Sequence, residues 1–123
     1  MLASLQDLNI DTNAVGGQNP SELALLNSAT KVIMNSNAFT GTIPTELGTM
    51  QSIQRLWIDN SNLGSTIPTE LGQLSNTLAD LRLFKNKLTG SIPGELGDFI
   101  RTDIRRTRTW NIRWNMRWNM AWQ

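Results

Sequence analysis

The chain has 123 residues, enough for one domain, with 39% hydrophobic and 17% charged residues and a net charge of +1. It contains no cysteine, histidine or tyrosine, which excludes disulfides, thiolate or imidazole metal sites and histidine general bases. No signal peptide is visible at the start, and no apolar run reaches the roughly 18 residues of a membrane span. We expect no cofactor, and the composition leaves the localisation open.

One heptapeptide, Thr-Ile-Pro-Thr-Glu-Leu-Gly, occurs at 42–48 and again at 66–72. A relaxed copy lies at 91–97 and a weaker one surrounds Pro20, so that the four prolines are spaced by 24, 24 and 25 residues. A fixed period in this range predicts a stack of repeats, each of which buries its apolar face only against its neighbours. Alignment on the prolines predicts four repeats, which span 5–28, 29–52, 53–77 and 78–101.

Each repeat opens with apolar residues at i, i+3 and i+5, a spacing that predicts a short, half-buried strand. Asparagine follows in three repeats and Ser61 in the third, where the side chain can cap backbone groups along the stack. A glycine then predicts a bend, and the Ile-Pro pair predicts an extended segment that leads into a short helical turn. The predicted strand positions in the core are Leu5, Leu8, Ile10, Ala29, Val32, Met34, Ile53, Leu56, Ile58, Leu78, Leu81 and Leu83.

The complete pattern reads Leu-x-x-Leu-x-Leu-x-x-Asn-x-Leu-Thr-Gly-x-Ile-Pro-x-Glu-Leu-Gly and is best preserved at 78–97. It resembles the plant-type leucine-rich repeat (LRR) of plant receptor-like kinases and receptor-like proteins and of algal and diatom proteins. The resemblance implies an α/β solenoid over residues 2–101. This would be a right-handed coil with a short parallel sheet on its concave side and short helical or 3-10 turns on its convex side. The chain departs from the pattern at Ala29, Ser61 and Asn19.

A glutamate recurs after each proline, and such a series could be mistaken for catalytic carboxylates. Each one lies in the first helical turn, where an acidic side chain favours the positive end of the helix. We interpret the series as structural and expect no enzyme, because no other arrangement of acid, base and nucleophile is present. Its members are Glu22, Glu46, Glu70 and Glu95.

The candidate binding residues are strand side chains that face away from the core. They form three rows across the repeats: Asn9, Ile33, Trp57, Arg82; Asp11, Asn35, Asp59, Phe84; and Thr12, Ser36, Asn60, Lys85. In the LRR family such positions line the concave face, where partners usually bind. Tryptophan and arginine are enriched at interface hot spots. The predicted partner-binding residues are Ile33, Trp57, Asp59, Arg82, Phe84 and Lys85. Alternatively, the apolar members only pack on one another across strands.

Past Arg101 the repeat pattern ends and the charge changes sign. Residues 1–100 hold five Lys/Arg and nine Asp/Glu, whereas residues 101–123 hold six Arg and one Asp. Four tryptophans recur every fourth residue from Trp110. The tail at 102–123 could cap the stack, bind nucleic acid or an anionic membrane, or be a disordered low-complexity end. The abrupt change of composition favours the last interpretation.

The leading hypothesis is a non-enzymatic LRR interaction module that binds a protein or peptide on its concave face. The first alternative is a fragment of a larger LRR receptor-like protein that contributes ligand recognition to signalling. The second is association with nucleic acid or a membrane through the tail, although the repeats favour a protein partner. The sequence leaves the oligomeric state open.

Overall fold

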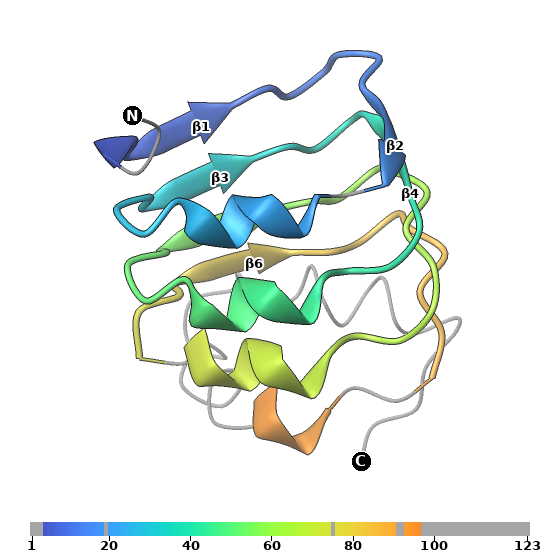
Figure 1. Cartoon of the computed structure of the whole chain (residues 1–123). Helices are drawn as coiled ribbons and strands as arrows, with labels where there is room; N and C mark the ends of the chain where they lie inside the picture. The colour runs from blue at the N-terminus through green and yellow to red at the C-terminus, as the bar shows by residue number, and fades with distance from the viewer. Residues whose placement is uncertain (1–3, 19, 75, 91–92, 97–123) are drawn as a thin grey trace.

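The computed structural model describes residues 4–18, 20–74, 76–90 and 93–96. In these residues the chain forms coils that stack on one another, and each coil passes from a short strand to a 3-10 helix (Figure 1). The strands of the first sheet are β1 (Asp7–Asn9), β3 (Lys31–Ile33), β5 (Arg55–Trp57) and β6 (Asp80–Arg82). The 3-10 helices are η2 (Ser21–Leu25), η3 (Thr45–Thr49), η4 (Thr69–Leu74) and η5 (Gly94–Leu96).

The first sheet is parallel throughout and runs in the order β1-β3-β5-β6. Leu8 pairs with Val32, Val32 with Leu56, and Leu56 with Leu81, which matches the predicted repeat offsets. Only the last offset is 25 residues. The turn before β6 accommodates the extra residue. Its hydrogen bond runs from Leu78 N to Leu74 O, four residues back, whereas the corresponding hydrogen bond in the preceding coil, from Ile53 N to Met50 O, spans three residues. The strands therefore stay in register.

The predicted core residues fill the interior between this sheet and the helices. Val32, Leu56 and Ile58 are fully buried, as are the equivalent residues of β6. In the first coil the side chains of Leu5, Leu8 and Ile10 are only partly buried and pack against the core from its edge. Among the described strands β1 and β6 are the two edges of the sheet, but only the β1 edge leaves its core side chains partly exposed, since Leu81 and Leu83 are buried.

The four prolines start the helical turns, as the sequence predicts. Pro20 and Pro44 stand at the N-caps of η2 and η3 with extended backbone, at φ −74° and −64°. Each proline oxygen accepts the amide of the leucine three residues later, at 3.1–3.3 Å in all four coils. That leucine then points into the core, as Leu47 does with no exposed surface. The repeated glutamate lies in the first turn of every helix, as predicted.

Asparagine side chains bond neighbouring coils together where strands turn, which confirms the predicted capping role. Asn37 Nδ2 donates to the main-chain oxygens of Ile10 in the coil before (3.0 Å) and of Met34 in its own coil (3.0 Å). Its Oδ1 accepts the amide of Val15 at 3.2 Å. Asn86 repeats the arrangement two coils further on, with Ile58 O, Leu83 O and Leu63 N. The shorter Ser61 makes a different bond, to Asn37 O at 3.2 Å.

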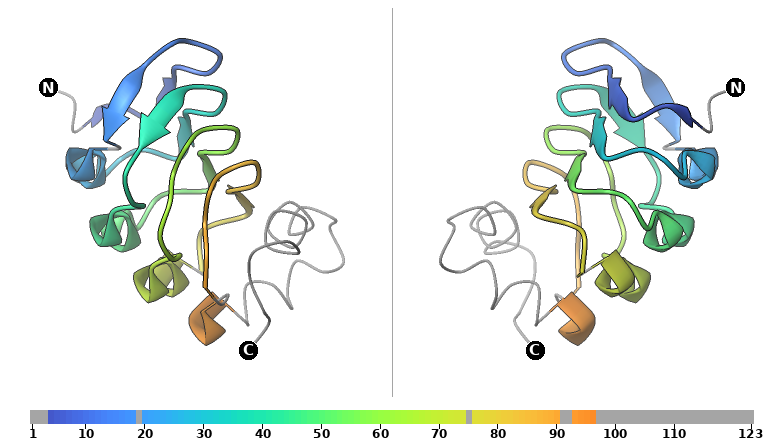
Figure 2. Two further views of the ribbon diagram at one scale, coloured as in Figure 1. Left: turned by 90° about the vertical axis from the view of Figure 1, so that its right-hand side faces the viewer. Right: turned by 90° about the vertical axis from the view of Figure 1, so that its left-hand side faces the viewer.

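A second, two-stranded sheet joins the first two coils and was not predicted. Its strands β2 (Gly16–Gln18) and β4 (Ala38–Thr40) are parallel and lie between the first sheet and the helices (Figure 2). β2 consists of two glycines and a glutamine, and glycine is depleted in strands, so the sequence indicated only a bend there. The pairing results from stacking, which brings the two segments into register.

One position, three residues before the proline, requires a left-handed backbone. Gly41 and Gly90 have φ of 80° and 82° there, and Gly17, which lies within β2, has φ 88°. In the third coil the order Gly64-Ser65 puts serine at this position, at φ 63°. We expect Ser65→Gly to raise the free energy of unfolding by about 0.5–1 kcal/mol, because relief of left-handed strain exceeds the added chain entropy. Urea unfolding would measure this gain.

Gly41→Ser is the matched control for that substitution, because it recreates the arrangement of the third coil in the second. It should lower the free energy of unfolding by about 0.5–1 kcal/mol, because the left-handed strain again exceeds the chain-entropy term. A Cβ at Gly41 would meet only the flexible side chain of Gln18, 3.3 Å away, so most of the loss would come from the backbone. Equal stability of both variants and the wild type would contradict the assignment of strain to Ser65.

Candidate partner-binding surface

The outward side of the four-stranded sheet, here called the sheet face, carries the predicted rows. Strand pairing places Asn9, Ile33, Trp57 and Arg82 side by side, as predicted. The second row continues in the same register beyond the strand ends, because Ser36 N donates to Asp59 O at 3.0 Å and Asn60 N to Phe84 O at 2.9 Å. The sequence analysis missed a further row, two residues earlier in each strand: Asp7, Lys31, Arg55 and Asp80. The period-2 alternation of strand side chains could have predicted this row, because residues two apart on a strand face the same side.

Trp57, Arg82 and Asp80 form one cluster on β5 and β6. The Arg82 guanidinium lies 3.6 Å from the centroid of the Trp57 ring, within cation–π distance. Its Nη2 and Nε donate to the two carboxylate oxygens of Asp80, at 3.3 and 3.4 Å. Because Asp80 is only 5% exposed, this two-point contact holds the guanidinium over the indole. The cluster therefore presents Trp57 in one fixed orientation.

Asp59 differs most from its expected environment. The sequence placed it on a solvent-facing row, but its side chain is only 6% exposed. Burial raises the pKa of its carboxyl group above the ordinary value of 3.8, and nearby Asp80 adds to this. A backbone hydrogen bond and the positive charges of Arg82 and Lys85 act in the opposite direction. The sheet face thus holds a desolvated acidic group that the sequence pattern did not reveal.

Three buried polar atoms of the sheet face have no hydrogen-bond partner among the described residues. They are Asn35 Oδ1, Trp57 Nε1 and Asp59 Oδ1. Buried polar side-chain atoms are usually paired, and leaving one unpaired costs free energy. Trp57 lies at the end of β5, and Asn35 and Asp59 lie two residues past the ends of β3 and β5, so the unpaired atoms come from two neighbouring coils.

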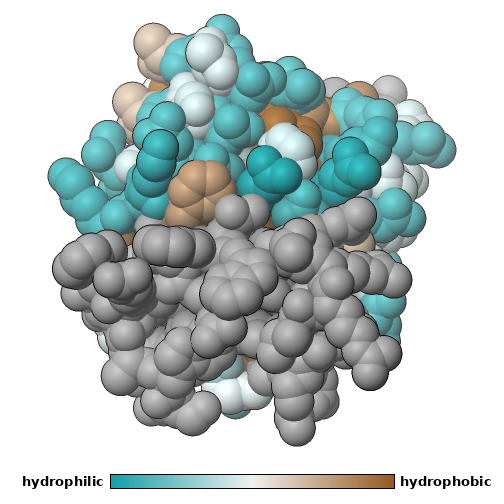
Figure 3. Space-filling view, turned by 180° about the vertical axis from the view of Figure 1, so that it is seen from behind, coloured by the Kyte–Doolittle hydropathy of each residue, from teal (hydrophilic) through white to brown (hydrophobic). Residues whose placement is uncertain are grey.

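The other predicted residues surround this group. Ile33 and Phe84 are half-buried, and Ile33 is the direct neighbour of Trp57 in the sheet, as the packing alternative expects. Lys85 is exposed and adopts a left-handed backbone at φ 55°, like Thr12, Ser36 and Asn60 in the same row. The described part of the sheet face is mainly hydrophilic, with separate hydrophobic side chains set into it (Figure 3).

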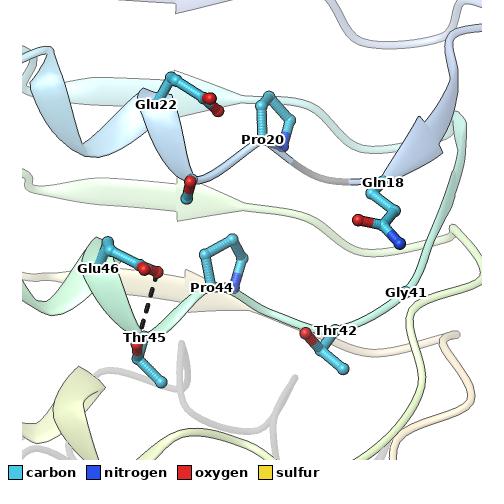
Figure 4. Close-up of a pocket in the computed structure, with 9 residues that line it drawn as sticks. Gln18, Pro20, Glu22, Gly41, Thr42, Pro44, Thr45 and Glu46 are labelled. Carbon is cyan, nitrogen blue, oxygen red and sulfur yellow. Dashed lines mark hydrogen bonds between the residues drawn. The ribbon is translucent and has the colours of Figure 1, made fainter.

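The helical side carries an open groove between the first two coils. Its volume is about 630 Å³, and Glu22 and Glu46 lie along it with Pro20, Pro44 and Gln18 (Figure 4). Glu46 Oε2 accepts a hydrogen bond from the Thr45 hydroxyl at 3.4 Å. Within the described residues, no three acidic side chains gather as metal ligands would. Every helix in those parts of the chain is too short or too polar to cross a lipid bilayer.

Comparison with known proteins agrees with the repeat pattern. A sequence model of the Leucine Rich Repeat family matches residues 52–74, whereas a search of curated proteins gave no match. The fold is similar to the LRR ectodomain of the membrane receptor kinase GASSHO1/SCHENGEN3 from Arabidopsis thaliana, solved in complex with CASPARIAN STRIP INTEGRITY FACTOR 2. The TM-score is 0.76 and the identity 32%, over 79% of this chain and 12% of that chain.

Two further structures show the same similarity. The Arabidopsis receptor kinase HAESA, solved with the peptide hormone IDA and the co-receptor SERK1, gives a TM-score of 0.74 and 33% identity over 78% of this chain and 16% of that one. The BIR3–SERK2 complex from Arabidopsis thaliana gives a TM-score of 0.71 and 30% identity, over 74% of this chain and 48% of that chain. This chain thus spans less than half of each of these proteins. From its repeat sequence, its stacked parallel strands and these similarities, the chain is a leucine-rich repeat protein of the plant type.

Proposed function

We propose that this chain is a non-enzymatic interaction module that binds a protein or peptide on its sheet face. In this proposal the chain forms a right-handed solenoid over residues 2–101, with the four predicted repeats, the sheet face concave and the helices on the convex side. Residues 102–123 form a separate tail. The tail lies outside the described residues, so its three predicted roles stay predictions.

The observation that carries the proposal is the cluster of unsatisfied polar atoms around Trp57. Trp57 is held in place by Arg82, and Oδ1 of Asn35 and Oδ1 of Asp59 have no hydrogen-bond partner among the described residues. Such an arrangement costs the free protein stability, and a bound partner that supplies hydrogen bonds would recover it. On the helical side, the open groove between η2 and η3 is lined by the carboxylates of Glu22 and Glu46.

The similar receptors support a peptide as the partner. The GASSHO1/SCHENGEN3 ectodomain was solved with CASPARIAN STRIP INTEGRITY FACTOR 2, and HAESA with a peptide hormone and a co-receptor. This chain covers only 12% and 16% of those two chains. A second candidate function is therefore recognition of a ligand as one part of a larger LRR receptor-like protein. Both candidates use the same surface, and both predict binding at Trp57.

We expect the double variant Trp57→Ala/Phe84→Ala to bind at least about thirtyfold more weakly to linear peptides selected on the wild-type chain from a displayed random library. The loss follows from removal of two aromatic side chains at a hot spot, where each truncation commonly costs 2 kcal/mol or more. Isothermal titration calorimetry would measure the dissociation constants.

The matched control changes two side chains away from the sheet face. Leu25→Ala/Thr45→Ala removes a 68% exposed leucine and an exposed threonine from η2 and η3. This control should bind the selected peptides as the wild type does. Equal affinity of both double variants, with both folded by circular dichroism, would place the binding surface elsewhere and defeat the proposal.

A further inference from the structure

We propose that Asn35, Trp57 and Asp59 form a subsite for a primary carboxamide, the side chain of an asparagine or glutamine in the bound peptide. This inference rests on the proposed function and names the group that the sheet face recognises. Its basis is the complementarity between the three unpaired atoms and one small chemical group. The two oxygens require hydrogen-bond donors, and the indole nitrogen requires an acceptor.

The backbone register places Asn35 and Asp59 one strand spacing apart, and we propose that a single amide nitrogen bridges their two oxygens. Asn35 and Asp59 occupy equal positions on neighbouring coils, since Met34 N donates to Trp57 O and Ser36 N to Asp59 O. Equal positions on adjacent strands lie about 4.8 Å apart. An NH₂ group with planar geometry and N···O distances of about 2.9 Å joins two oxygens about 5 Å apart. Its two hydrogens can therefore serve both oxygens.

The amide oxygen would meet the indole. Trp57 lies two residues before Asp59 in the chain and on the same side of the sheet, in the neighbouring row. Its Nε1–H is a donor only, and it lacks a partner among the described residues. The carbonyl oxygen of a carboxamide accepts that bond while its nitrogen serves Asn35 and Asp59. One group then satisfies all three atoms.

Other common groups satisfy fewer of these atoms. An ammonium or guanidinium group has donors only, which leaves the indole N–H unpaired, and it would approach the positive charges of Arg82 and Lys85 near Asp59. A carboxylate has acceptors only and would be repelled by Asp59. A hydroxyl has a single donor and so serves one of the two oxygens. Among amino-acid side chains, the carboxamide of asparagine or glutamine is the neutral group that carries both two N–H donors and a carbonyl acceptor.

The binding test uses Trp57→Phe, which keeps an aromatic ring and removes only the N–H donor. We expect this variant to bind asparagine- or glutamine-containing peptides, selected on the wild-type chain, about tenfold more weakly. When the critical asparagine or glutamine of the peptide is replaced by leucine, Trp57→Phe should bind as the wild type does, because the acceptor is gone.

Two results would overturn the subsite. One is selected peptides without any requirement for asparagine or glutamine. The other is an equal effect of Trp57→Phe on the amide and leucine peptides. Either result leaves the proposed function intact if Trp57→Ala/Phe84→Ala still abolishes binding, so the two failures are distinguishable. Selection of no peptide at all would defeat both.

A stability measurement on the free full-length chain tests the same idea without a peptide. If the Asp59 carboxylate is unpaired in the free protein, Asp59→Asn should raise the thermal midpoint of unfolding at pH 7. The substitution removes a buried charge and keeps the shape of the side chain. Burial raises the pKa of Asp59 in the folded state. The ionised carboxylate therefore destabilises the fold fully above that pKa, and this destabilisation decreases as the pH falls towards 3.8. The gain in midpoint should therefore shrink over that range. A lower midpoint at pH 7 would show that the existing contacts of the Asp59 carboxylate outweigh the cost of its burial and would overturn the subsite.

Discussion

Replacement of Gly48 by alanine is expected to destabilise the stack by about 3 kcal/mol, the largest loss that we predict for a single methyl group. Gly48 is buried in η3, where it lies against the backbone of η4. A Cβ at this position would overlap the carbonyl oxygen of Glu70 and lie 2.9 Å from its carbonyl carbon. Because the obstacle is backbone, the two coils would have to separate, and overpacking in a tight interior is costly. Urea unfolding followed by circular dichroism would measure the loss.

The chain contains a close match and a control for this experiment. Gly72→Ala should behave similarly, because its Cβ would lie 2.7 Å from the main-chain oxygen of Glu95 in η5. Gly94→Ala lies in a helix of the same kind, but a Cβ there would meet nothing within 4 Å. It should change stability by less than about 0.5 kcal/mol. A Gly48→Ala variant as stable as Gly94→Ala would disprove the close approach of the helices.

Asn37→Ala is expected to cost about 2–3 kcal/mol, the second largest effect. The substitution removes an amide that bonds the first coil to the second through Ile10 O and Val15 N and also bonds Met34 O. The main-chain oxygens of Ile10 and Met34 that are left behind are partly buried, and an unpaired buried polar group costs about 1–3 kcal/mol, whereas Val15 is exposed. The free energy of unfolding in urea is again the measurement.

Two variants at equivalent positions complete this test. Asn13→Ala removes an exposed side chain whose bonds, to Ile10 O and Asp11 O, stay within one coil, so the loss should be smaller. Ser61→Asn should raise stability, because the longer side chain can reach carbonyl oxygens as Asn37 and Asn86 do. Equal losses from Asn13→Ala and Asn37→Ala would show that bonding between coils adds nothing.

Much of the candidate site could be predicted because parallel pairing preserves the repeat offset. Once Leu56 pairs with Leu81, the neighbouring Trp57 must pair with Arg82, and the row follows. The burial of Asp59 could not be predicted, because a row position states only which way a side chain points. The contact of Arg82 with both Trp57 and Asp80 could not be predicted either, because the long arginine side chain can reach several neighbours in different rotamers.

The repeat pattern alone established the period, the strand register, the core and the family, because each of these depends on residue type recurring at a fixed spacing. It also located the proline-started helical turns and the asparagine bonds, which are local in origin. Folding in three dimensions determined the rest: the β2–β4 pairing, the strain at Ser65, the close contact at Gly48 and the unpaired atoms around Trp57. These features arise where different coils meet. The distance between two coils depends on the packing of both, so the sequence of a single repeat does not predict it.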